Sequence, residues 1–153
     1  MRAYELAVGY PTVTPDSGAL DAARLLAEHR LPGLLVVDGD HRPVAVLPGS
    51  QFLRFMIPRY VQDDPNLARV FDESHADRLS DKLAGKRVAD LLPKEATAPP
   101  IVDANATAIE IATVMANTRS PLVAVSSDPR RTDAPMIGVV TVSQLLTRLL
   151  PPA

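Results

Sequence analysis

Apolar and polar positions in the first 58 residues predict a strand, a helix, two strands and a second helix. Residues 12–14 form a short segment rich in β-formers, which predicts a strand. Residues 19–27 place apolar side chains at helical spacing, which predicts a helix. The continuous apolar run at 34–37 predicts a buried strand, and residues 44–47 predict its antiparallel neighbour. A final helix is expected over 50–57, where Pro58 ends it.

The same order of patterns returns near the end of the chain. Strands are predicted at 101–102, 122–125 and 137–141, with a helix from 107 to 118 and a last helix over 143–150. Short lead-in segments at 3–8 and 88–92 precede the two series. Each series therefore predicts a β-α-β-β-α unit with a short lead-in.

Local signals suggest how these elements begin and turn. Thr107 and Glu110 have the spacing of a capping box, and Ser50 and Ser143 are expected to cap the last helix of each unit. Asp38-Gly39-Asp40 predicts a hairpin turn of the Asp-Gly type.

The two series are copies of one another. Residues 13–37 align without a gap with 102–126, and 7 of the 25 pairs are identical. Residues 44–53 align with 137–146 after four additional residues in the second copy. A doubled supersecondary unit predicts two halves that share a core. We expect one repeat at 1–58, a helical linker at 59–86 and a second repeat at 87–153.

Composition narrows the functional classes. The chain has 153 residues, 46% of them hydrophobic, no cysteine and a net charge of −2. Disulfides, thiol catalysis and cysteine metal sites are excluded. No membrane-length apolar run and no secretory signal are visible, so direct membrane insertion is not expected and a cytoplasmic location is the simplest expectation. Interleaved charges and an aromatic content of 4% do not favour nucleic acid as a partner.

Four features, the first three of them in the same order in both copies, resemble the CBS domain pair, or Bateman module, of bacterial type. They are a short strand before a helix start (13–17 and 102–106), the mid-helix Ala23 and Ala112, a helix-ending proline, and Gly138-Val139-Val140-Thr141. The resemblance implies an α/β (α+β) fold in which two tandem β-α-β-β-α repeats pack with pseudo-twofold symmetry.

The resemblance also implies a regulatory sensor. Family members commonly bind adenosine nucleotides or related adenosyl compounds between the repeats, with a hydroxyl near phosphate and an aspartate on the ribose. AMP, ADP, ATP and S-adenosylmethionine are the expected regulatory ligands, and no cofactor is required. In the second copy, the residues expected to contact the ligand are Arg119, Pro121, Leu122, Thr141, Ser143 and Gln144.

The first copy departs further from the family pattern. Pro48 occupies the hydroxyl position and Ala45 the glycine position, while Gln51 and Gln144 replace the aspartate in the two copies. The corresponding ligand contacts in the first copy are Arg30, Pro32, Gly33, Ser50 and Gln51. The second copy is therefore expected to dominate binding, and the first is degenerate or binds something other than a nucleotide.

Other candidate chemistry has simpler interpretations. His29, His41 and His75 lack partners at metal-ligand spacing, and the segment 72–77 could hold a cation but more simply forms a solvated helix face. Arg130 and Arg131 could reach a ligand phosphate or an acidic partner, but they are more simply interpreted as exposed charged residues of a loop. No catalytic residue and no metal site is predicted, and the protein is not expected to be an enzyme.

Dense apolar patches on the last helix of each copy favour a homodimer. They include Phe52, Phe55, Met56 and Ile57, and Leu145, Leu146, Leu149 and Leu150. Since no catalytic domain is attached, output is expected in trans on an unidentified regulated protein, such as an enzyme or a transporter. The alternative is a ligand-free interaction or scaffold subunit with degenerate nucleotide sites.

Overall fold

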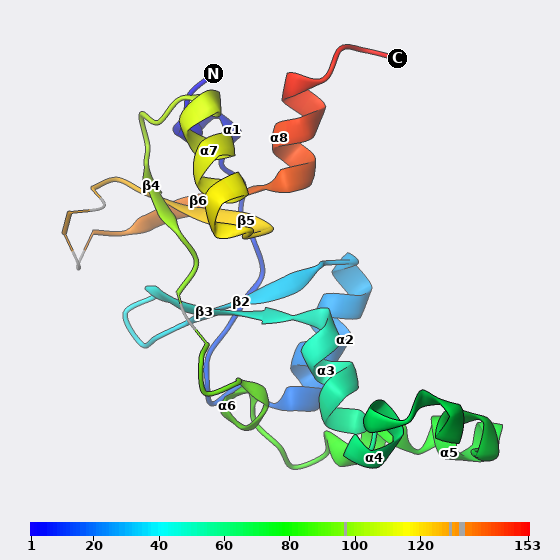
Figure 1. Cartoon of the computed structure of the whole chain (residues 1–153). Coiled ribbons are helices and arrows are strands. Elements are labelled where there is room, and N and C mark those ends of the chain that lie inside the picture. Colours follow the sequence, from blue (N-terminus) through cyan, green and yellow to red (C-terminus); the bar gives the residue numbers. More distant parts are fainter. Residues whose placement is uncertain (97, 129, 132–133) are drawn as a thin grey trace. The chain divides into compact units, whose positions relative to one another are not determined.

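The computed structural model describes residues 1–96, 98–128, 130–131 and 134–153, and it contains the predicted series of elements twice (Figure 1). The first series is β1 (Thr12–Val13), α2 (Ala19–His29), β2 (Gly33–Val37), β3 (Pro43–Pro48) and α3 (Gly49–Met56). The second is β4 (Ile101–Asp103), α7 (Ala108–Thr118), β5 (Leu122–Ser126), β6 (Met136–Thr141) and α8 (Val142–Leu149). The α/β fold class and the doubling are confirmed.

The strands form two three-stranded sheets, ordered β1-β2-β3 and β4-β5-β6. In the second sheet β4 runs parallel to β5, with Val102 opposite Val125. β5 and β6 are antiparallel, with Leu122 opposite Thr141. This register places the start of β5 beside the end of β6, where α8 begins. Part of the loop between β5 and β6, residues 129, 132 and 133, lies outside the described residues.

Helices α7 and α8 cover one face of the second sheet with a continuous apolar core. Ile111 of α7 is fully buried, and Leu145 of α8 is 4% exposed. The cluster also includes Val123, Val125 and Val140 from the sheet. Each buried side chain of this kind contributes about 1.5–3 kcal/mol relative to leaving it exposed.

The two lead-in helices are exchanged between the repeats. α1 (Ala3–Leu6) precedes the first repeat but bonds to the second, since the Ala3 N–H donates to the Ala106 carbonyl at 2.8 Å. α6 (Val88–Leu91) precedes the second repeat but bonds to the first, since the Val88 N–H donates to the Ser17 carbonyl at 2.8 Å. Sequence reasoning predicted both lead-in segments but not this exchange.

The chain after α1 explains the glycine of the 138–141 motif. Val8 and Val139 exchange two backbone hydrogen bonds of 3.0 Å. A Cβ atom built on Gly138 would lie 2.9 Å from the Val8 carbonyl oxygen, which is closer than side chains tolerate. Glycine at 138 therefore lets the N-terminal segment join β6.

Contacts divide the chain into two compact units that interleave along the sequence. One contains residues 1–12, 37–45 and 97–153, and the other contains 13–36 and 46–96. The repeat boundaries at 58 and 86 and the pseudo-twofold packing remain predictions.

The segment between the repeats consists of four short helical elements. They are α4 (Arg59–Asp63), η1 (Pro65–Val70), α5 (Glu73–Asp77) and η2 (Leu79–Lys82). Asp64 and Asp72 cap η1 and α5 by accepting backbone N–H groups. Gly85, at φ 74°, adopts the left-handed conformation that glycine tolerates best.

Four local predictions need correction, beginning with two helix caps. Thr141 and Pro48, not Ser143 and Ser50, are the N-cap residues of α8 and α3. The reason is that β6 and β3 run directly into these helices, so both serines lie inside the first helical turn.

The other two corrections concern the α7 cap and the hairpin turn. The Thr107 hydroxyl oxygen accepts the Glu110 N–H, as predicted. The Glu110 carboxylate accepts from the Thr107 hydroxyl, whereas a capping box would have it accept the Thr107 backbone N–H. The hairpin is not an Asp-Gly turn, because its left-handed residue is His41 at φ 61°. The Asp38 carboxylate accepts the Arg42 and Asp40 N–H groups, which lowers its pKa.

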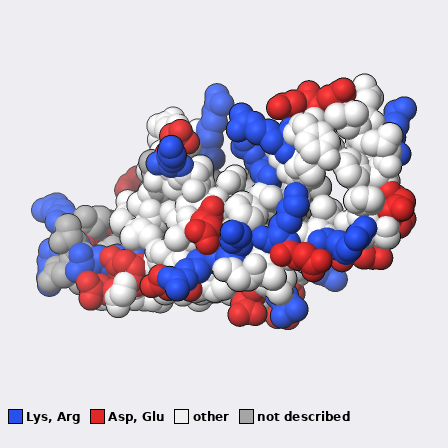
Figure 2. Space-filling model, turned by 90° about the horizontal axis from the view of Figure 1, so that it is seen from below, with Lys and Arg blue, Asp and Glu red and all other residues white. Residues whose placement is uncertain are grey.

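On the face shown in Figure 2, acidic and basic side chains alternate without a large area of one sign. Within the described residues, no helix is both long and apolar enough to cross a membrane.

Candidate functional site

In the second repeat, most of the predicted ligand contacts meet at the start of α8. The Val142 N–H donates to the Pro121 carbonyl at 3.0 Å, which fixes the helix-ending proline beside the first turn of α8. Leu122 pairs with Thr141 across the sheet. The structure therefore brings Pro121, Leu122 and Thr141 together, with Ser143 and Gln144 in the first turn of α8.

Thr141 and Gln144 are engaged with one another in a capping box. The Thr141 hydroxyl accepts the Gln144 N–H at 3.3 Å, and the Gln144 side-chain oxygen accepts the Thr141 N–H at 2.9 Å. The Thr141 oxygen is thus an acceptor inside the protein, while its own proton remains able to donate to a ligand oxygen. Gln144, which stands where the resemblance implies an aspartate that binds ribose, is occupied by the cap.

The first repeat has the matching arrangement at the start of α3, but its polar contacts differ. The Gly49 N–H donates to the Pro32 carbonyl at 3.0 Å, as Val142 does to Pro121. Pro48 has no N–H and no hydroxyl, so no capping box can form. Gln51 instead donates its side-chain amide to the Leu91 carbonyl at 2.8 Å, which ties α3 to α6. Matching glutamines therefore have different roles in the two repeats.

Arg30 and Arg119 both end a helix in the left-handed conformation, with φ of 53° and 54°. This position usually favours glycine. Both side chains are exposed, and Arg119 lines an apolar groove together with Pro121 and Val142. The structure gives Arg30 and Arg119 a shared backbone role, and their contact with phosphate remains a prediction.

Gly33 and Leu122, the remaining predicted contacts, begin the central strands. Leu122 is fully buried. A Cβ atom on Gly33 would lie 3.0 Å from the Leu47 carbonyl oxygen, so glycine permits close approach of β3. Their positions fit strand packing, and ligand contact remains a prediction for both.

The apolar groove beside Arg119 lies between α7 and α8. Met115 and Leu145 form its buried floor, and Leu146 and Leu149, each 46% exposed, lie along it. Exposed apolar area therefore gathers along this groove.

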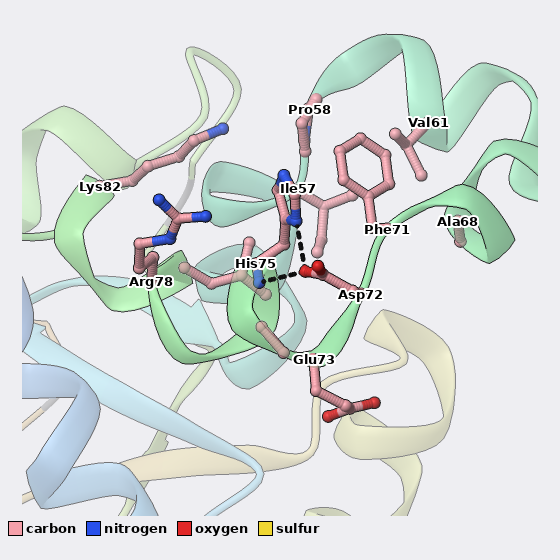
Figure 3. A pocket seen from close by; sticks show the side chains of 12 residues that line it. Ile57, Pro58, Val61, Ala68, Phe71, Asp72, Glu73, His75, Arg78 and Lys82 are labelled. Carbon is pink, nitrogen blue, oxygen red and sulfur yellow. Dashed lines mark hydrogen bonds and ion pairs between the residues drawn. The ribbon is translucent and has the colours of Figure 1, made fainter.

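The acidic segment at 72–77 is organised around Asp72. Its carboxylate accepts from the Ser74 hydroxyl at 2.6 Å and lies 2.8 Å from His75 Nδ1 (Figure 3). The Ser74 hydrogen bond, followed by those of His75, lowers the pKa of Asp72 to about 2. Within the described residues no group of three or more His, Cys, Asp or Glu side chains is arranged to hold a metal ion.

Sequence reasoning missed a hollow of about 510 Å³ that is lined by residues from 57 to 82. Its lining consists of Ile57, Pro58, Val61, Ala68, Phe71, Asp72, Glu73, His75, Ala76, Arg78, Leu79 and Lys82. The scattered apolar residues of 59–86 were the only available signal. They predict helices but not which side chains face a common space.

Two comparisons with known proteins point to the same family, and a third found no match. The family model described as "CBS domain" matches residues 7–57. No curated protein matches the chain. A solved CBS domain-containing protein of unknown function from Kribbella flavida is 47% identical, with a TM-score of 0.86 and 99% of each chain covered.

Less similar structures share the fold. CBSX2, a CBS-pair protein from Arabidopsis thaliana, is 20% identical with a TM-score of 0.70, covering 97% of this chain and 93% of that chain. CBSX2 in complex with AMP is 21% identical with a TM-score of 0.64, covering 97% and 95%. Identity of 47% over nearly the full length of both chains, together with the doubled β-α-β-β-α order, shows that this chain belongs to the family of CBS domain-containing proteins.

Proposed function

We propose that this CBS-pair protein is a regulatory sensor that binds an adenosine nucleotide or a related adenosyl ligand and acts in trans on a partner protein. Its role would be binding and not catalysis. Ligand would act by binding two arrangements of the module with different affinity. The regulated partner would be an enzyme or a transporter.

The observation that carries this proposal is the geometry at Thr141. Its hydroxyl oxygen already accepts the Gln144 N–H, so the hydroxyl proton is the group left to meet an incoming acceptor. It lies at the start of a helix, where a phosphate is favoured. Pro121 and Leu122 lie beside it. AMP binding by the distantly related CBSX2 supports the ligand class.

A specific observation also favours the alternative, a ligand-free interaction subunit. Gln144 and Gln51 are both used in hydrogen bonds within the protein, to the Thr141 N–H and the Leu91 carbonyl. A ribose would have to displace one of these bonds, and a neutral amide is a weaker acceptor than the carboxylate it replaces. Nucleotide affinity should therefore be modest at best.

Assembly forms part of the proposal. We propose that the groove between α7 and α8, with Leu146 and Leu149 along it, is covered by a second copy of the chain. The mixed charges visible in Figure 2 do not favour nucleic acid as a partner.

A thermal-shift experiment with AMP, ADP, ATP and S-adenosylmethionine tests the sensor proposal. Free ligand at about 100 times its dissociation constant adds about 2.7 kcal/mol of stability. For a chain of this size, that is on the order of 5–10 °C in Tm. Each variant is compared with its own ligand-free Tm: Thr141→Val should lose the response, and Pro48→Thr tests whether a hydroxyl restores it in the first repeat. No shift in wild type or Pro48→Thr at millimolar ligand would favour the interaction subunit.

A further inference from the structure

The hollow lined by residues 57–82 has an apolar floor. Val61 is buried beneath it, while Ile57, Phe71 and Leu79 are only half-buried. The Phe71 and His75 rings meet edge to face, with centroids 5.0 Å apart, which fixes one wall. At about 510 Å³ the space falls within the usual range for small-molecule pockets.

Two cations occupy one edge of this hollow. In Figure 3, the side chains of Arg78 and Lys82 lie on the same side of it. The Arg78 Nε–H donates to the Ser74 carbonyl at 3.2 Å, leaving its terminal nitrogens available. Among the described residues, Lys82 has no ion pair and no side-chain hydrogen bond.

Within the described residues, neither acidic lining residue forms an ion pair with Arg78 or Lys82. The Asp72 carboxylate already accepts from the Ser74 hydroxyl and the His75 backbone N–H. The Glu73 carboxylate points away from Arg78 and Lys82 in Figure 3. Two cations beside an apolar floor therefore suit an anion that carries an apolar body.

We propose that this hollow is a binding site for a small organic carboxylate with an aliphatic body. The carboxylate binds Arg78 and Lys82, and the aliphatic chain lies over Ile57, Phe71 and Leu79. The site is formed by residues 57–82 alone, so it does not rest on nucleotide binding at Thr141.

Octanoate is a suitable probe, and octanamide is its uncharged control. Titration of the ¹⁵N-labelled full chain should shift amide resonances within 57–82. Octanamide should bind at least about tenfold more weakly, a factor that corresponds to about 1.4 kcal/mol. The double variant Arg78→Gln, Lys82→Gln should raise the Kd for octanoate by a similar factor, whereas Arg69→Gln, in the same segment but outside the lining, should not.

A second pair of variants tests the location without changing charge. Ala68→Leu adds bulk to the lining and should block octanoate, whereas Ala84→Leu, outside the lining, should leave binding unchanged. Three results would overturn the proposal: no binding at millimolar octanoate, equal affinity for octanamide, or shifts confined to residues outside 57–82.

Discussion

At the residue scale, one substitution changes the role of a matched side chain. Thr141 supplies an N–H and a hydroxyl, so Gln144 folds back and caps α8. Pro48 supplies neither, so Gln51 reaches across to Leu91. The same residue type at the same repeat position therefore caps a helix in one unit and joins two helices in the other.

The α8 cap gives the first prediction. Thr141→Val keeps the side-chain size but removes the hydroxyl, and it should cost about 1 kcal/mol of unfolding free energy. In a chain of this length that lowers Tm by roughly 2–4 °C. Ser143→Ala is the matched control and should have little effect, because Ser143 lies inside the helix. Urea unfolding measures the free energy of unfolding of both variants, and equal losses would contradict the assignment of Thr141 as the cap.

The second prediction concerns Gln51. Gln51→Leu preserves bulk but leaves the Leu91 carbonyl without its 2.8 Å donor, so stability should fall by about 1 kcal/mol. The loss should be local, so hydrogen exchange of the α6 amides should accelerate. Gln62→Leu, which removes hydrogen bonds to Arg54 and Ile57 instead, should leave α6 protected. Unchanged α6 exchange in Gln51→Leu would count against this link.

The third prediction is a titration. Because the folded-state pKa of Asp72 is depressed to about 2, its contribution to stability is fully present above its unfolded value near 3.9. It is lost as pH falls through about 2. Ser74→Ala removes the largest cause and should raise the pKa of Asp72, as followed by the carboxyl ¹³C shift. Ser80→Ala, which does not contact Asp72, should not move it, and an unmoved value in Ser74→Ala would exclude this cause.

At the element scale, apolar periodicity predicted the strands and helices of both repeats because each element buries one patterned face. The N-caps of α3 and α8 were misplaced because Pro48 and Thr141 end a strand and cap the following helix at the same time. The apolar pattern shows the end of the strand but does not show that the helix begins at once. The exchange of α1 and α6 was unpredictable, since an apolar segment such as Ala3–Leu6 does not specify which repeat it contacts. The hollow at 57–82 was missed for the same reason.

The exchange of lead-in helices gives a fourth prediction. A fragment spanning 10–96 contains β1–β3 together with α6, whose Val88 and Leu91 are 0% and 1% exposed. It should unfold cooperatively in urea. The predicted repeat 1–58 lacks α6 and should not. A cooperative transition in 1–58, monitored by circular dichroism, would show that α6 is dispensable.

At the scale of the whole molecule, the exposed leucines of α8 lead to the fifth prediction. A homodimer through the groove between α7 and α8 should be disrupted by Leu149→Glu, since burying an unpaired charge is costly. Thr147→Glu, on the same helix but outside the groove, should leave the dimer intact. Light scattering at micromolar concentration measures the mass, and a monomeric wild type would exclude this assembly.

The exchanged helices also set the order in which the protein can fold during synthesis. The Ala106 carbonyl that accepts the Ala3 N–H leaves the ribosome about a hundred residues after α1. At typical elongation rates that separation is roughly 5 to 20 s. The unit containing α6 can complete its contacts once residue 96 has emerged. The unit that holds the N-terminal segment can therefore complete its core only later, and until then Leu6 lacks the core contacts that bury it.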